Sequence, residues 1–197
     1  MTPNYKKLSI LFVCLIILST SIFAQSIDFS GATIINPEKK NPQMAKAVQV
    51  LREEIQKRTH MLLPVAEKPS AKTKLTIWIG VESRLNNLPA QSKTVLAQLP
   101  ATAKDGFKAI RADDQTIVIA GYDERGALYG VGWLLRKSEL YPNKFIVPQG
   151  ISVSSSPTYP IRGHQLGYRP KTNAYDAWTV AQYDQYIRDL STFGANS

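Results

Sequence analysis

The stretch DGFKAIRADDQTIVIAGYDERGALYGVGWLL, residues 105–135, decides the fold of this chain. Its segments FKAIR and TIVIAG predict the two strands of a β-hairpin, because the two aspartates between them form a polar turn. The remainder predicts a helix, since Asp123 can cap it and apolar residues follow at spacings of three and four. A hairpin that leads directly into such a helix indicates a helix packed on a sheet.

The segments on either side extend this pattern. Residues 41–60 predict a helix, with Asn41 as the cap and Pro42 at the first helical position. Residues 74–81, KLTIWIGV, predict a strand, and FIVP and ISVSSSP predict further strands. The order of strands and helices predicts an α/β or α+β fold, with helices packed on a mixed β-sheet.

Residues 1–24 have the features of a signal peptide. Two lysines precede an apolar run over residues 10–18, and Ala24 stands before the expected cleavage point. The run is too short to span a bilayer. We therefore expect an exported protein, periplasmic or extracellular, with no stable membrane span after cleavage. The single cysteine, Cys14, lies in the signal, so no disulfide is expected.

The net charge of +9 does not by itself indicate a nucleic-acid partner. The basic residues are scattered and mixed with acids, so we expect no nucleic-acid binding. The sequence has no zinc-ligand spacing, phosphate-binding loop or dinucleotide turn, so no metal and no cofactor is expected. His60 ends the helix predicted over residues 41–60, where a cation near the helix dipole explains it better than a metal ligand does.

A serine- and proline-rich stretch, SVSSSPTYP, predicts a boundary between residues 25–156 and residues 157–197. The second segment predicts one β/α unit, with a strand IRGHQLGY, a polar loop and a helix TVAQYDQYIRDLSTFG. Thr179 and Gln182 form a capping box at the start of this helix, and Gly194 stops it. The side chains that we expect to be buried on this helix are Tyr183, Ile187 and Leu190.

One β/α unit has no neighbour of its own kind to pack against. A complete eight-stranded β/α barrel needs about 250 residues. We therefore expect residues 157–197 to be the first unit of a truncated, TIM-like catalytic barrel.

The hairpin and helix resemble the small domain that precedes the barrel in several glycoside hydrolases, including family 20 β-hexosaminidases and family 67 α-glucuronidases. The resemblance extends over residues 31–153 and implies a hexosaminidase domain 2-like N-terminal domain over residues 25–156. In such a domain Arg125 would pair with an acid or cap carbonyl groups rather than contact substrate. The residues that carry the resemblance are Asp105, Gly106, Phe107, Gly121, Arg125, Gly126, Leu128, Tyr129 and Gly130.

The terminal segment is also similar in outline to the first barrel strand and helix of family 20 hexosaminidases. Two departures stand out, because Gly167 occupies the place of an aspartate and Arg169 falls one position early. Specific sugar recognition is therefore not carried over from that family. The residues that follow the outline are Arg162, Gly163, Leu166, Arg169, Thr179 and Asn196.

Four residues of this segment are the candidates for contact with a carbohydrate substrate: His164, Tyr168, Arg169 and Asp176. They fall on or just after the expected barrel strand, where the substrate face of a barrel lies. An arginine fork can bind sugar hydroxyls or a uronate carboxylate. Two alternatives stay open, a packing role for His164 and a loop-capping role for Asp176. Trp178 could stack on a sugar ring or cover the barrel mouth.

Glycoside hydrolysis normally uses two carboxylates that flank the scissile bond. After Glu139 the sequence has only Asp176, Asp184 and Asp189, so we expect no catalytic residue and no turnover by this chain alone. The sequence thus predicts the N-terminal portion of an exported glycoside hydrolase that acts on O-glycosidic bonds in glycan breakdown, either α-glucuronidase-like or β-hexosaminidase-like. The alternative is a non-catalytic carbohydrate-associated accessory or binding domain.

Overall fold

The computed structural model describes residues 26–165 and 178–197. The predicted signal peptide, residues 1–24, and three of the candidate site residues, Tyr168, Arg169 and Asp176, lie outside the described residues. The elements in chain order are β1 (Ile27–Asp28), β2 (Thr33–Ile35), α2 (Pro42–Thr59), β3 (Val65–Ala66), β4 (Thr76–Val81), η1 (Glu82–Arg84), α3 (Ala90–Ala97), β5 (Phe107–Arg111), β6 (Thr116–Gly121), α4 (Glu124–Lys137), β7 (Glu139–Tyr141), β8 (Lys144–Val147), β9 (Ser152–Ser155) and α5 (Val180–Thr192).

A six-stranded mixed sheet forms the centre of the molecule, in the order β3-β2-β4-β6-β5-β9. The strands β3, β2, β4 and β6 run parallel, and β5 pairs antiparallel with both β6 and β9. The predicted hairpin is confirmed, since Phe107 pairs with Gly121 and Arg111 with Ile117. In the turn, the Gln115 amide donates to Oδ1 of Asp113 at 2.7 Å.

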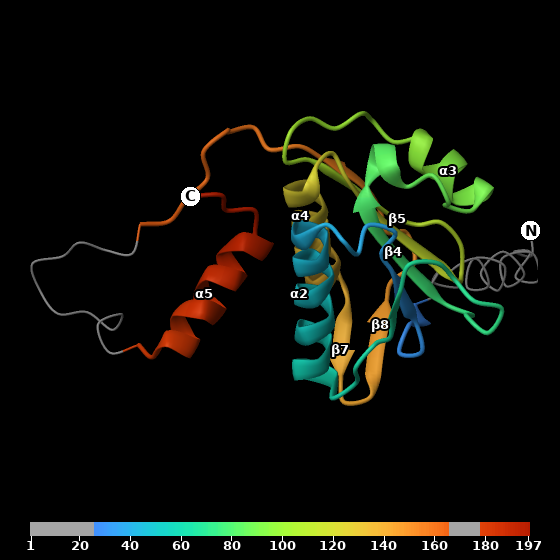
Figure 1. Ribbon diagram of the computed structural model, residues 1–197, viewed down its shortest axis with the longest axis horizontal. Helices are drawn as coiled ribbons and strands as arrows, with labels where there is room; N and C mark the ends of the chain where they lie inside the picture. The colour runs from blue at the N-terminus through green and yellow to red at the C-terminus, as the bar shows by residue number, and fades with distance from the viewer. Residues whose placement is uncertain (1–25, 166–177) are drawn as a thin grey trace, which may run out of the picture.

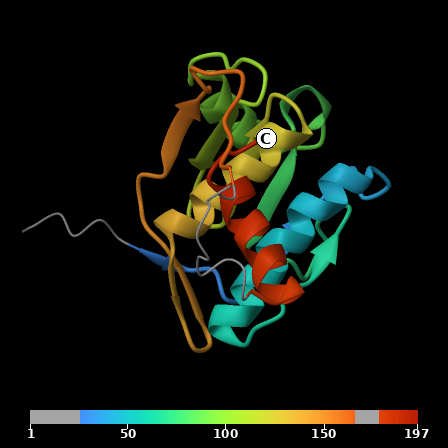
Figure 2. The same cartoon turned by 90° about the vertical axis from the view of Figure 1, so that its left-hand side faces the viewer.

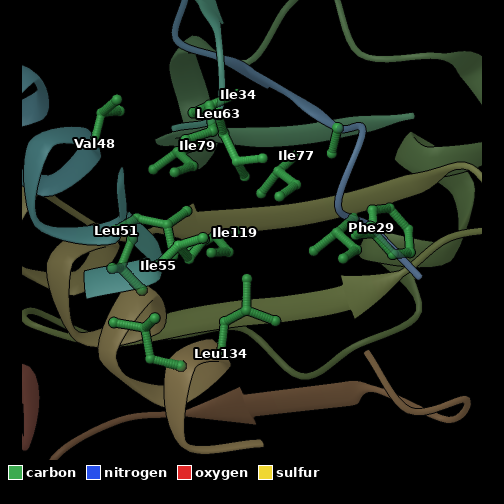
Figure 3. Packing of buried hydrophobic residues seen from close by; sticks show 14 of the residues in the cluster. Phe29, Ile34, Val48, Leu51, Ile55, Leu63, Ile77, Ile79, Ile119 and Leu134 are labelled. Carbon is green, nitrogen blue, oxygen red and sulfur yellow. The ribbon is translucent and has the colours of Figure 1, made fainter. Parts of the chain in front are cut away.

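The predicted packing of helices on a mixed sheet is confirmed, and the helices cover both faces of it. Figure 1 shows α2 and α4 on one face and α3 on the other. The larger hydrophobic core lies beneath α2 and α4 and includes Leu51, Ile79, Ile119 and Leu134, which Figure 3 shows packed between the helices and the strands. Because β4 and β6 are buried on both faces, they are continuous apolar runs rather than alternating ones.

A smaller core fills the space between the sheet and α3. Trp78 points to this side of β4, whereas its neighbours Ile77 and Ile79 point to the α2 and α4 side. The side chains of Leu88 and Leu96 cover this smaller core, and Leu96 belongs to α3. The strand predicted at residues 74–81 thus supplies both cores.

A second, three-stranded antiparallel sheet has the order β1-β8-β7. Its pairing brings Ile27 opposite Val147 and Leu140 opposite Phe145. The sequence predicted β8 from FIVP but not its pairing with β1, which precedes it by more than 100 residues. Phe145 and Val147 are buried in the larger core, so this sheet closes one end of it.

The predicted caps position α2. Asn41 Oδ1 accepts hydrogen bonds from the amides of Gln43 and Met44 at 3.0 and 3.2 Å. At the other end His60 adopts a left-handed conformation with φ 63°, and its amide donates to the Gln56 carbonyl. His60 is exposed, and it lies at the C-terminus of the helix as the sequence predicted.

Two glycines let α4 lie directly on the sheet. A Cβ at Gly126 would overlap the carbonyl oxygen of Gly106, and one at Gly130 would overlap the side chain of Ile119. Asp123 caps this helix by accepting a hydrogen bond from the Gly126 amide at 2.8 Å. The absence of side chains at these two glycines therefore allows the close approach of α4 to the sheet.

The terminal segment departs from the sequence prediction in two respects. Its helix is confirmed as α5, with the Thr179 and Gln182 capping box in place. Residues 161–165, the described part of the expected strand, are not in a regular strand. The expected buried stripe is also wrong, because Thr192 is the buried residue of α5 and Ile187 is 54% exposed. The reason is that α5 contacts α2 through the polar side chains of Gln185 and Arg188, and α4 through its C-terminal end.

Figure 2 shows α5 lying over α2 and α4, on the side away from the sheet. The described residues therefore contain one helix of the expected β/α unit but not a barrel. Among the described residues, none of the helices is both long and apolar enough to cross a membrane.

Candidate functional site

His164 is the one candidate sugar-contacting residue that falls within the described part of the chain. It is exposed, and its Nδ1 lies 2.7 Å from the hydroxyl of Tyr186 on α5. The two rings meet edge to face, with centroids 5.7 Å apart. A packing role for His164 is therefore disfavoured, because its ring lies at the surface.

Trp178 extends this group of rings. Its ring centroid lies 5.2 Å from that of Tyr186 and 5.4 Å from that of Tyr183, both edge to face. We call His164, Trp178, Tyr183 and Tyr186 the aromatic cluster. Aromatic rings and a hydrogen-bonding imidazole are groups that can contact a sugar ring. The sequence singled out His164 and Trp178. It missed Tyr186, although the spacing of three from Tyr183 on a helix was a usable signal.

The two acids of α5 do not form a catalytic pair. Asp189 accepts a hydrogen bond from Gln185 Nε2 at 2.8 Å, and Asp184 lines a cavity of about 370 Å³ between α5 and the helices α2 and α4. Both side chains are exposed. The described residues contain no group of three or more His, Cys, Asp and Glu side chains that could hold a metal ion.

The carboxylates at the carboxyl end of β4 are held by cations. Arg84 binds Glu38 at 2.7 Å and Glu124 at 2.6 Å, and Asn41 Nδ2 donates to Glu124 at 2.9 Å. The hydrogen bond from Arg84 lowers the pKa of Glu124. A carboxylate kept ionised by a bound guanidinium is a poor general acid, so this group fastens α4 to α2 and β4 rather than performing chemistry.

Asp105 is a buried carboxylate with three side-chain partners. It is 4% exposed and adopts a left-handed conformation with φ 64°. Arg125 Nη2 lies 2.8 Å from its Oδ1 as an ion pair, without the alignment of a hydrogen bond. Arg162 Nη2 and Asn196 Nδ2 donate to its Oδ2 at 2.9 and 3.2 Å. The sequence predicted that Arg125 would pair with an acid, and this is confirmed.

The environment of Asp105 favours its charged form. Burial raises the pKa of this carboxyl, but the hydrogen bonds from Arg162 and Asn196 and the charges of Arg125 and Arg162 outweigh burial and hold the pKa below its usual range. The same hydrogen bond raises the pKa of Arg162. Asp105 is therefore ionised and binds Arg125, Arg162 and Asn196 in that form.

Each of the three guanidinium nitrogens of Arg162 donates a hydrogen bond to another part of the protein. Its Nε donates to the Gly194 carbonyl at 2.8 Å, its Nη1 to the Tyr159 carbonyl at 2.7 Å, and its Nη2 to Asp105. Its guanidinium also lies over the ring of Tyr129, 5.5 Å from the centroid. This arginine joins the terminal segment to the rest of the molecule.

The backbone at Arg162 and Asn196 runs side by side. The Asn196 amide donates to the Arg162 carbonyl at 2.7 Å, and the Arg162 amide donates to Oδ1 of Asn196 at 2.9 Å. The sequence placed Arg162 on the expected barrel strand and named Asn196 as part of the outline shared with family 20 hexosaminidases. The structure brings the two positions together.

The fold has counterparts among known proteins. The family model described as Glycosyl hydrolase family 67 N-terminus matches residues 29–132, more than half of the chain. The chain belongs to this family. The match runs from the residues before β2 to the middle of α4, so it includes Asp105, Arg125 and the glycines under α4. It stops before β7, β8, β9 and α5. The resemblance predicted from residues 105–135 is confirmed.

Solved structures of glycoside hydrolases resemble this family 67 N-terminal domain in fold. A family GH115 4-O-methyl-alpha-glucuronidase with specificity for decorated arabinogalactans shares 16% sequence identity, with a TM-score of 0.54 over 84% of this chain and 24% of that chain. A mutant Streptomyces plicatus beta-hexosaminidase in complex with GlcNAc shares 14% identity, with a TM-score of 0.48 over 71% of this chain and 25% of that chain. CpGH84B shares 14% identity, with a TM-score of 0.49 over 86% of this chain and 32% of that chain.

The chain spans about a quarter of the length of the GH115 structure that it matches. No curated protein matches the chain. The comparisons therefore establish an N-terminal domain of the glycoside hydrolase kind, with a mixed α/β fold.

Proposed function

We propose that this family 67 N-terminal domain is the non-catalytic part of an exported glycoside hydrolase that cleaves O-glycosidic bonds in glycan breakdown. The observation that carries the proposal is the family match over residues 29–132. The site geometry supports it, because the buried or ion-paired carboxylates Asp105 and Glu124 serve structure and neither is poised as a general acid.

Within this class we favour an α-glucuronidase over a β-hexosaminidase. The family whose model matches is family 67, whose members the sequence resemblance associates with α-glucuronidases. The GH115 structure with the same fold is a 4-O-methyl-alpha-glucuronidase. The proposed substrate is a glycan that carries α-linked glucuronic acid or its 4-O-methyl ether.

A comparison of two proteins tests this proposal. One is the chain that ends at Ser197, and the other is the product of the same reading frame followed past Ser197. Each is incubated with a glucuronic-acid-decorated oligosaccharide, and released uronic acid is measured by chromatography. We expect release by the longer product alone, since a glycosidase needs a carboxylate pair. Release by the chain ending at Ser197, or a frame without further coding sequence, would contradict the proposal.

Export is a separate proposal that rests on the basic, apolar and small-residue pattern of residues 1–24. The protein is produced with its full N-terminus in a Gram-negative host, and the form outside the cytoplasm is sequenced from its N-terminus. We expect a chain that starts at Gln25. A full-length chain retained in the cytoplasm would rule out cleavage and export.

The aromatic cluster supports the second candidate, a carbohydrate-binding function without catalysis. Trp178 is partly exposed beside the exposed His164, and a stacked sugar could use both. Titration calorimetry with glucuronic-acid-decorated oligosaccharides tests it. Heat that disappears in Trp178→Ala but persists in Trp133→Ala would support binding at the cluster, and no heat with any oligosaccharide would exclude it.

A further inference from the structure

Two buried carboxylates are contacted by side chains from residues 159–165 and 178–197. Asp105 is 4% exposed and accepts from Arg162 and Asn196. Glu54 of α2 is 3% exposed, and Arg188 of α5 lies 3.5 Å from it. Gln185 Nε2 of α5 also donates to Glu54, at 3.3 Å.

Each carboxylate also binds an arginine from within residues 25–156. Arg125 binds Asp105 at 2.8 Å, and Arg58 binds Glu54 at 3.0 Å in an i, i+4 pair. One oxygen of each carboxylate is thus occupied from within residues 25–156, and the other faces the terminal segment. A buried carboxylate needs partners for both oxygens, so these two positions are acceptors that the terminal segment completes.

The surface between the two carboxylates is shaped for the end of α5. A Cβ at Gly132 would overlap the carbonyl oxygen of Thr192, so a glycine is needed where α4 meets α5. Arg136 Nη1 donates to the same carbonyl at 2.6 Å, and its guanidinium lies over the ring of Phe193 at 4.4 Å from the centroid. A cation at the C-terminal end of a helix also interacts favourably with the helix dipole.

We propose that Asp105, Glu54 and Gly132 form a docking surface whose partner is residues 159–165 and 178–197 of the same chain, and that this surface fixes the backbone that carries His164. We call it the carboxylate socket. Charge complementarity carries the argument, because two arginines of the terminal segment, Arg162 and Arg188, each reach a carboxylate that is more than nine-tenths buried. The inference holds whether or not the protein hydrolyses a glycan.

The socket sets the position of His164 through Arg162. The side chain of Arg162 is fixed by Asp105 and its backbone by Asn196, and His164 follows two residues later. Asp105 is therefore a positioning residue for the aromatic cluster, which it does not contact itself. Figure 1 shows the chain passing from β9 over the top of α4 to this segment.

Hydrogen exchange measured by mass spectrometry on the whole chain tests the socket. We expect Asp105→Asn and Arg162→Gln each to raise amide exchange in α5 by about tenfold or more, as for loss of a hydrogen bond to a charged group, while β4 and β6 keep their protection. Asp114→Asn is the control, because Asp114 is exposed and its ion pair with Arg111 lies elsewhere. Unchanged exchange in α5, or an equal loss in every element, would overturn the proposal.

A second readout separates positioning from general stability. The chain has two histidines, and His60 at the end of α2 serves as the internal control for His164. We expect Arg162→Gln to shift the imidazole proton resonances of His164 and leave those of His60 unchanged. This variant removes the partner from the terminal segment and leaves Arg125 on Asp105, so it tests the socket even if Asp105→Asn fails to fold. Resonances that stay unchanged for both histidines would refute a positioning role.

Discussion

At the residue scale, single glycines and one carboxylate decide how the layers meet. Gly126 lies against the backbone of Gly106, and Gly132 lies against the backbone of Thr192. In both places another chain segment occupies the space of a side chain. At Asp105 a side chain is needed, because its charge holds together four chain segments that meet there.

Substitution of Gly126 tests this close packing. We expect Gly126→Ala to lower the free energy of unfolding by about 1–3 kcal/mol, because the added methyl group overlaps a backbone carbonyl that cannot rotate away. The matched control is Gly31→Ala, where a Cβ would meet no atom within 4 Å. Urea unfolding followed by tryptophan fluorescence measures both. Equal stability of the two variants would show that α4 can move off the sheet at little cost.

The ionisation of Asp105 gives a prediction on pH. Its pKa is lower in the folded state than in the unfolded chain, so its contribution to stability is present above its unfolded pKa of about 3.9 and is lost as the pH falls through its folded pKa. The charged and titratable groups around it are Arg125, Arg162, Tyr129 and Asp123.

The measurement is the difference in melting temperature between the wild type and Asp105→Asn. We expect a clear difference at pH 7 that shrinks as the pH falls below 4, because protonation abolishes the charge that the substitution removes. Subtracting the variant cancels the titration of the other carboxyl groups. A difference that stays constant down to pH 3 would mean that charge at Asp105 does not contribute.

At the element scale, helices end and begin where the sequence indicates, but their burial depends on neighbours. Both α4 and α5 have an apolar stripe in the sequence. In the fold Leu134 of α4 is fully buried between helices and sheet, whereas Ile187 of α5 is 54% exposed. The difference arises because α4 is the middle layer and α5 the outer one.

This contrast predicts two unequal truncations. We expect Leu134→Ala to cost about 2–5 kcal/mol of unfolding free energy, as is typical for a fully buried leucine, and Ile187→Ala to cost much less. Chemical denaturation of both variants measures the difference. A similar cost at the two positions would show that the Ile187 side chain is more buried than the structure indicates.

The capping box of α5 gives a prediction local to that helix. Thr179 Oγ1 accepts from the Gln182 amide, and Gln182 Oε1 accepts from the Thr179 amide at 2.8 Å. We expect Thr179→Ala to destabilise α5 by about 1 kcal/mol and to raise its amide exchange alone. Thr94→Ala in α3 is the control, since Thr94 is exposed and caps no helix start. Faster exchange in β6 as well would contradict a local effect.

At the scale of the whole molecule, the N-terminal domain has three layers, and α5 forms a further layer outside them. The sheet lies between α3 and the pair α2 and α4, and α5 covers that pair (Figure 1). The carboxylate socket joins the outer layer to the others through Arg162 and Arg188. The three residues of the socket lie within the matched residues 29–132, whereas Arg162 and Arg188 lie outside them.

The sequence by itself determined the hairpin over β5 and β6 and the caps of α2, α4 and α5. These features depend on residues within a few positions of each other, where turn chemistry, capping and apolar spacing act directly. For the same reason the resemblance to family 67 N-terminal domains could be read from residues 105–135.

Only the tertiary structure decided the strand order β3-β2-β4-β6-β5-β9, the sheet β1-β8-β7 and the meeting of Asp105 with Arg162 and Asn196. The two partners of Asp105 are 57 and 91 positions away from it in the chain. Contacts at that separation leave no periodic pattern in the sequence, because each depends on how several layers pack at once. The sequence shows that residue 105 is an aspartate, but only the fold shows that Arg162 is the arginine that binds its second oxygen.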